Sequence, residues 1–140
     1  MNFWDSSALI EAHDTLSAER GRFLSLLRQK TLHAASKLIV PEVVAALARR
    51  SRNNLAERDR LLREAMDALA RFLLHTVADD IVEDSIPIAR SDGLKGADAV
   101  HLATALAMAR DVGRKGFVFM TRDKEQAAAA RRRGLRVIGA

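Results

Sequence analysis

The sequence predicts an α/β fold of three layers, α/β/α, with a central and mostly parallel sheet. Apolar segments typical of strands alternate with amphipathic helical segments from residues 2–5 to residues 135–138. This alternation implies parallel pairing through right-handed crossovers. The chain has 140 residues, 49% hydrophobic and 29% charged, which suits a single domain over residues 1–140 with a buried core.

In the first half of the chain, residues 2–5 are predicted to form a strand that ends in Asp5-Ser6-Ser7. Any of these three side chains can cap the helix that follows from residue 8. Apolar residues on one face predict a helix over 23–27, and residues 32–36 are expected to form a second strand despite their His-Ala-Ala composition. A helix over 41–50 begins with Pro41 and Glu42, an order that suits a first helical turn.

In the second half, Leu62, Met66, Leu69 and Leu73 recur at helical spacing and predict a long amphipathic helix over 55–74. The expected elements that follow are a strand over 75–77, a short helix over 81–90 and, after two glycines, a helix over 97–111. Residues 116–121 (GFVFMT) give the clearest strand signal. A helix over 124–133 that stops at Gly134 and a strand over 135–138 complete the chain.

Composition limits the classes of function. The chain has no cysteine, so disulfides and thiolate metal sites are excluded. A formal charge of +5 favours polyanionic partners, nucleic acid first among them. Most of the few aromatic residues fall in expected core strands, which leaves base stacking a minor role. No segment resembles a signal peptide or a membrane span, so we expect a cytoplasmic protein with no membrane partner.

Four acidic residues, each at the start of an expected helix, are the candidate site: Asp5, Glu42, Asp98 and Asp123. Each by itself is explained by helix capping or by the helix dipole. Together, they could meet at the carboxyl edge of a parallel sheet, where ligands of α/β folds bind. Two carboxylates about 5 Å apart repel by roughly 3 kcal/mol at an effective dielectric of 20. A hard divalent cation such as Mg²⁺ would relieve that repulsion.

The chain resembles the PIN domain nucleases, and among them the VapC-type toxins of toxin–antitoxin pairs, in DSS at the start, Glu42 before an Ala-Leu helix, DAVHLATA, and TRDKEQAAAARRRGLRVI. The resemblance implies a metal-dependent endoribonuclease that uses Mg²⁺, with Mn²⁺ as a substitute, and that hydrolyses RNA phosphodiester bonds. It also implies a cognate antitoxin and a homodimer. The positions that match the family's site residues are the acids Asp5, Glu42, Asp98 and Asp123, with the hydroxyls of Ser7 and Thr121 as supporting neighbours.

Other hypotheses stay open at this point. A basic RNA-binding or partner-binding module could keep this fold without the reaction. Transfer through an aspartyl-phosphate on Asp5 would normally need a second Asp where Ser7 stands. We interpret His101 as a partly buried helix residue, with contact to substrate or to a carboxylate as the alternative. The sequence gives no place to Asp92. The arginines Arg49, Arg50, Arg52, Arg131, Arg132 and Arg133 could bind phosphates or could complement helix dipoles.

Overall fold

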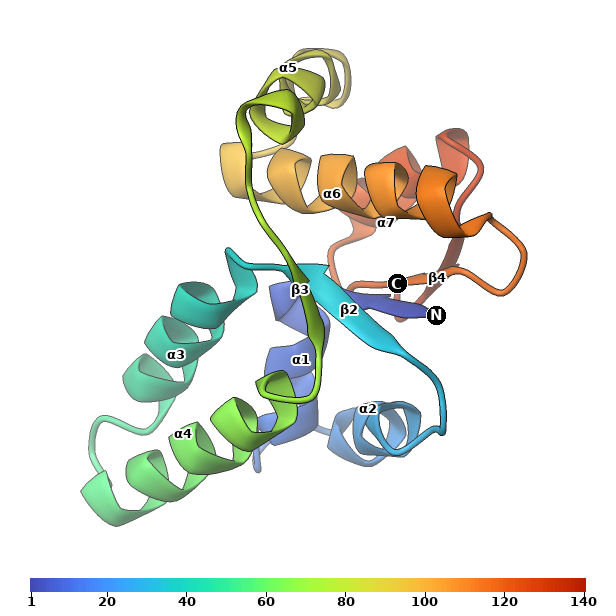
Figure 1. The fold of residues 1–140 in the computed structure, drawn as a ribbon. Coiled ribbons are helices and arrows are strands. Elements are labelled where there is room, and N and C mark those ends of the chain that lie inside the picture. Colours follow the sequence, from blue (N-terminus) through green and yellow to red (C-terminus); the bar gives the residue numbers. More distant parts are fainter.

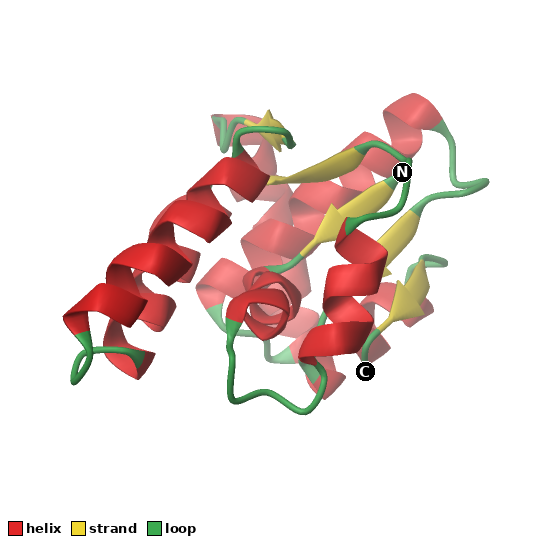
Figure 2. Ribbon diagram, turned by 90° about the horizontal axis from the view of Figure 1, so that it is seen from below, coloured by secondary structure: helices red, strands yellow, loops and turns green.

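The computed structural model describes residues 1–140 as a five-stranded parallel sheet with helices on both faces (Figures 1 and 2). The strand order is β3-β2-β1-β4-β5, and all four neighbouring pairs are parallel. The predicted three-layer α/β/α fold is therefore confirmed. The strands are β1 (Asn2–Trp4), β2 (His33–Ser36), β3 (Leu73–His75), β4 (Val118–Met120) and β5 (Arg136–Ile138).

Seven helices form the two outer layers, α1 to α4 on one face of the sheet and α5 to α7 on the other (Figure 1). The pair α3 and α4 extends away from the sheet, whereas α6 lies across it. No helix is long and apolar enough to cross a membrane. The helices are α1 (Ser6–His13), α2 (Arg20–Leu27), α3 (Ile39–Arg50), α4 (Leu55–Leu69), α5 (Asp79–Asp92), α6 (Gly96–Val112) and α7 (Lys124–Arg132).

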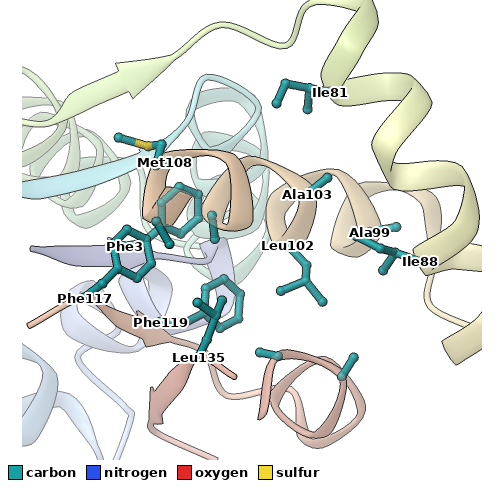
Figure 3. Close-up of a cluster of buried hydrophobic side chains, with 14 of the residues drawn as sticks. Phe3, Ile81, Ile88, Ala99, Leu102, Ala103, Met108, Phe117, Phe119 and Leu135 are labelled. Atoms are coloured by element: carbon teal, nitrogen blue, oxygen red, sulfur yellow. The ribbon is translucent and has the colours of Figure 1, made fainter. Parts of the chain in front are cut away.

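Two hydrophobic cores, one on each face, follow from the alternation of side chains along the strands. Phe3 points into the core under α5, α6 and α7, where its ring stacks on Phe117 and Phe119 at centroid distances of 6.3 and 5.8 Å (Figure 3). Trp4 points into the opposite core, packs against Phe23 of α2 and is fully buried. The sequence prediction that the strand aromatics belong to the core is confirmed.

The third strand corrects one sequence prediction. The expected helix over 55–74 ends at Leu69, and the expected strand over 75–77 lies two residues earlier, at Leu73–His75. Leu73 fits the helical spacing by coincidence: its side chain is 48% exposed, and its strand pairs with β2 at the edge of the sheet. Backbone pairing with a neighbouring strand, which local periodicity cannot report, overrides helical propensity at this position.

The sheet has a topological switch point between β1 and β4. The chain moves outward from β1 through β2 to β3 and then returns to the other side of β1 to form β4 and β5. The carboxyl ends of β1 and β4 therefore lie next to each other, and Asp5 N donates to the Met120 carbonyl at 2.9 Å. Ligands of open α/β sheets bind in the crevice at such a point.

Candidate metal centre

Asp5 follows β1 directly and is only 1% exposed. It caps α1, because its Oδ2 accepts hydrogen bonds from the Ser7 amide at 3.1 Å and from the Ser7 hydroxyl at 2.5 Å. Its other oxygen, Oδ1, accepts from Gln126 Nε2 at 3.2 Å. Charge-assisted hydrogen bonds of this kind compensate a buried carboxylate for the water that it loses. The side chain is thus fixed from both sides, by residues that lie far apart in the sequence.

Gln126 is the site residue that sequence reasoning missed. It lies on α7 with 0% exposure, and its amide donates to both the Asp5 carboxylate and the Asp98 backbone carbonyl, the latter at 3.1 Å. Its Oε1 accepts the Thr121 hydroxyl proton at 2.6 Å. The available signal was a glutamine three residues after the helix-capping Asp123, which matches a capping box. In that motif the side-chain oxygen of Gln126 would accept from the Asp123 N–H, and the side chain would not reach across the site.

The Thr121 hydroxyl explains why Gln126 does not close that capping box. Thr121 Oγ1 accepts from Asp123 N at 3.0 Å. The backbone N–H that Gln126 would bind in a capping box therefore already has a partner. Asp123 still caps α7 through Oδ1, which accepts from Gln126 N at 2.8 Å. Thr121 itself is fully buried and lies 3.3 Å from both Ser7 Oγ and Asp5 Oδ2. The two hydroxyls expected beside Asp5 are therefore found there.

Glu42 reaches the same region from the first turn of α3. Its Oε2 accepts the Ser6 hydroxyl at 2.6 Å, and His101 Nε2 lies 3.1 Å from its Oε1 and 4.0 Å from Asp5 Oδ1. Burial opposes ionisation of Glu42, but the hydrogen bonds from His101 and Ser6 outweigh it and lower the pKa of Glu42 below its usual value. Burial likewise acts against the charged form of His101, yet the bond to Glu42 and the Asp5 charge raise its pKa.

His101 is fully buried on α6 and links two of the four acids, so of its two interpretations the structure supports the alternative, contact with a carboxylate. Its Nδ1 is buried without a hydrogen-bond partner. The imidazole therefore has a single polar attachment, which is the Glu42 carboxylate, with Asp5 beside it. Ser6 also belongs to the site through Glu42, although the sequence indicated only a cap for it.

Asp98 completes the group from the first turn of α6. Its pKa is raised to about 6, first by burial and then by the negative charges of Asp5 and Asp123. Glu42 acts in the same direction, whereas His101 opposes it. Carboxylates raise the pKa of one another only when they lie close together. The structure thus brings all four acids into one electrostatic group at the switch point.

The chemistry of this group fits a hard divalent cation, because four carboxylates supply oxygen donors and repel one another. As the side chains lie, no three acidic or histidine groups form a preassembled ligand set for one ion. Asp5 and Glu42 are both held by hydrogen bonds, whereas the partly buried Asp98 carboxylate has none. The Asp98 carboxylate is therefore free to turn towards a bound ion. The roles of the individual acids as ligands stay predictions.

Asp92, which the sequence left without a place, is not part of this group. It ends α5 and pairs with Arg132 and Arg133 at the end of α7, and its side chain is 5% exposed. The hydrogen bonds from Arg133 and Arg132 lower its pKa. In the cluster Arg131–Arg133, Arg132 and Arg133 therefore tie α5 to α7, and Arg131 donates to the carbonyl of Ala140. Phosphate binding by this cluster is not favoured.

The family follows from a comparison with known proteins, because the PIN domain family model matches residues 3–132. The chain belongs to the PIN domain family. Two curated relatives come from Mycobacterium tuberculosis: Ribonuclease VapC45 of strain CDC 1551 / Oshkosh and Ribonuclease VapC49 of strain ATCC 25618 / H37Rv. Each is 34% identical to this PIN domain over 140 residues, with 96% of this chain and 92% of the relative covered.

Solved structures of related fold agree with this family. Mycobacterium tuberculosis VapC20, described as a toxin that cleaves the sarcin-ricin loop, superposes with a TM-score of 0.67 at 22% identity over 92% of this PIN domain and 95% of that chain. A toxin–antitoxin complex from Klebsiella pneumoniae gives a TM-score of 0.65 at 22% identity, with 91% of each chain covered. VapBC2 from Rickettsia felis, bound to promoter DNA, gives 0.63 at 12% identity over 97% of this chain and 96% of that one.

Proposed function

We propose that this PIN domain is a metal-dependent endoribonuclease and the toxin of a toxin–antitoxin pair, with residues 1–140 acting as one nuclease domain. The observation that carries the proposal is the group of four carboxylates at the switch point, in which neighbouring charges contribute to raising the pKa of Asp98 to about 6. Two curated relatives named Ribonuclease VapC support it. Nothing in the site favours a module that has lost the reaction, because all four acids are present.

Each side chain has a role in this proposal. Asp5 and Asp98 hold the principal ion, and Asp123 supports it directly or through water. Glu42 completes the site or orients the attacking water, while Ser6 and His101 fix its carboxylate. Ser7, Thr121 and Gln126 fix Asp5. Bound Mg²⁺ or Mn²⁺ would supply a Lewis acid for the phosphate and a water of lowered pKa.

The proposed partners follow from the comparisons and from charge. The Klebsiella pneumoniae protein of related fold is a toxin–antitoxin complex, which supports a cognate antitoxin for this chain. The formal charge of +5 supports an RNA substrate, and the cytoplasm is the proposed location. A homodimer is part of the same proposal.

A cleavage assay with and without a chelator tests the reaction. Purified protein in Mg²⁺ is expected to cut structured RNA at internal positions, and EDTA is expected to abolish cutting because the water and the phosphate lose their electrophile. Excess Mg²⁺ or Mn²⁺ added after EDTA should restore it. RNA that is bound but left intact with either ion would instead support the inactive binding module.

Ion binding should depend on pH through Asp98. A carboxyl group whose pKa is about 6 must lose its proton to bind a cation, so affinity for Mn²⁺ is expected to fall about tenfold per pH unit below 6. Above pH 6 this dependence should disappear. Calorimetric titration of the protein with Mn²⁺ at several pH values measures it. A matched titration of Asp98→Asn should show weaker binding without the step near pH 6; a step of the same size in that variant would contradict the assignment.

A further inference from the structure

A cleft of about 590 Å³ extends from the acidic group along α3, and the proposed chemistry leaves it unexplained. Ser6 and Glu42 line the cleft, and Arg49 lines it farther along α3. Between them the wall is apolar and includes Ile10, Pro41 and the small side chains of Ala45 and Ala46. The cleft is therefore continuous with the site where a phosphate would react.

The spacing of Glu42, Ala45 and Arg49 along α3 places them on one helical face. Glu42 and Arg49 are seven positions apart, which corresponds to an axial distance of about 10 Å along the helix. This distance is short enough for a bound oligonucleotide strand to span. A strand with its reacting phosphate at the acids would bring a flanking phosphate to Arg49.

The Arg49 side chain has no hydrogen-bond or ion-pair partner within the chain. It enters none of the ion pairs, whereas its neighbour Arg50 pairs with Asp14. Arg49 stands in the last turn of α3, where a cation also complements the helix dipole. The exposed Arg52 at the same helix end does not line the cleft. Arg49 is thus the one cation that shares a cleft with an acid of the candidate site.

We propose that this cleft holds the single strand of RNA next to the reacting phosphodiester, with Arg49 bound to a backbone phosphate. The proposal rests on the proposed ribonuclease function and names a subsite for it. The apolar wall packs against sugar, and the alanines leave room for the strand. None of the lining residues is aromatic, so the subsite reads the backbone and not the identity of the base.

The test measures RNA binding without cleavage. A fluorescein-labelled single-stranded RNA is titrated with the Asp5→Asn protein in EDTA, at a series of salt concentrations. Adding Arg49→Ala is expected to weaken binding roughly fivefold at low salt and to reduce the slope of log affinity against log salt by about 0.7, the value for one lost phosphate contact on a single strand. The loss should be equal for RNAs of different sequence. Arg49→Lys should keep the slope, and the matched control Arg52→Ala should leave it unchanged.

A second pair of variants tests the cleft itself without removing the arginine. Ala45 is exposed on α3 and lines the cleft, and both Glu and Lys are good helix formers, so the fold should tolerate either. Ala45→Glu is expected to weaken RNA binding and Ala45→Lys to strengthen it.

Three results would overturn the subsite. If the wild-type protein cleaves RNA and the Asp5→Asn protein binds it, an unchanged salt slope on adding Arg49→Ala would refute the subsite. The ribonuclease proposal would then still stand. Changed sedimentation of the Ala45 variants with unchanged RNA affinity would assign the cleft to a second copy of the chain. A wild-type protein that neither cleaves nor binds RNA would refute the ribonuclease proposal as well.

Discussion

Asp98→Asn is expected to reduce RNA cleavage by at least about a thousandfold and, at the same time, to stabilise the metal-free protein. The loss of activity follows because Asp98 is proposed to hold the principal ion, whose effects on water and phosphate amount to several kcal/mol. The gain in stability follows because the ionised carboxyl is unfavourable in the folded state. Its pKa rises from 3.8 to about 6, which corresponds to at most about 3 kcal/mol above pH 6.

The sign of this stability effect follows from the proton balance. Between pH 3.8 and 6 the folded state retains a proton on Asp98 that the unfolded state has lost, so the metal-free wild-type protein loses stability as the pH rises through this window. The asparagine introduced by Asp98→Asn carries no charge in either state. The difference in free energy of unfolding between the two proteins should therefore be near zero at pH 4 and reach its full value, about 1–3 kcal/mol, at pH 7.

Urea unfolding in EDTA, together with the cleavage assay in Mg²⁺, measures both effects on the same preparations. The matched control is Asp84→Asn, which removes a surface carboxylate that pairs with Arg110 at 3.4 Å. Exposed pairs of this kind contribute at most about 1 kcal/mol to the free energy of unfolding. Asp84→Asn should therefore change stability by no more than that and leave the cleavage rate nearly the same. A metal-free Asp98→Asn protein that is less stable than wild type at pH 7 would contradict the picture of mutually repelling acids.

Gln126→Leu is expected to destabilise the protein by about 2–4 kcal/mol and to weaken metal binding by about 10–100-fold. Leucine has nearly the same size as glutamine, so the packing of α7 is preserved while three hydrogen bonds disappear. The Asp98 carbonyl, the Thr121 hydroxyl and Asp5 Oδ1 each lose a partner in a buried environment. An Asp5 carboxylate without this support is free to turn, and loss of residues that orient metal ligands has effects of this size.

Thermal unfolding and titration with Mn²⁺ check the two parts of this prediction separately. Gln29 is the chain's other glutamine, and it accepts a hydrogen bond from Asn2 away from the acids. Gln29→Leu should therefore leave Mn²⁺ affinity unchanged. If Gln126→Leu lost stability but bound Mn²⁺ as tightly as wild type, Gln126 would have a structural role and no part in positioning the acids.

The fold was largely predictable because local patterns carried it. Strand and helix signals alternate along the chain, and each parallel crossover has only one common hand. The helix that carries Asp98 in its first turn and the strand that ends before Thr121 were both found close to their predicted bounds. The prediction failed at Leu73, where a helical spacing continued into an edge strand. There the pairing with β2 decided the structure, and that pairing leaves no local trace in the sequence.

The candidate site was predictable only as a set of acids. Asp5, Glu42, Asp98 and Asp123 were visible because helix starts favour such side chains and because their motifs resemble those of one family. Gln126 was missed and the contact of His101 with a carboxylate was only the second choice, because a glutamine in a capping pattern and a histidine on an apolar helix have ordinary local explanations. Their partners, Asp5 and Glu42, lie 121 and 59 residues away.

The sequence by itself determined the order of strands and helices, the parallel sheet, and the position of each acid at a helix start. These features depend on periodicity and on local hydrogen-bonding groups, which act within a few residues. Only the tertiary structure decided that β1 and β4 adjoin, so that Asp5 meets Thr121 and Gln126, and that α3 and α6 bring Glu42 to His101. Hydrogen bonds across such separations form only after the two cores have packed, because the packing fixes where each side chain ends.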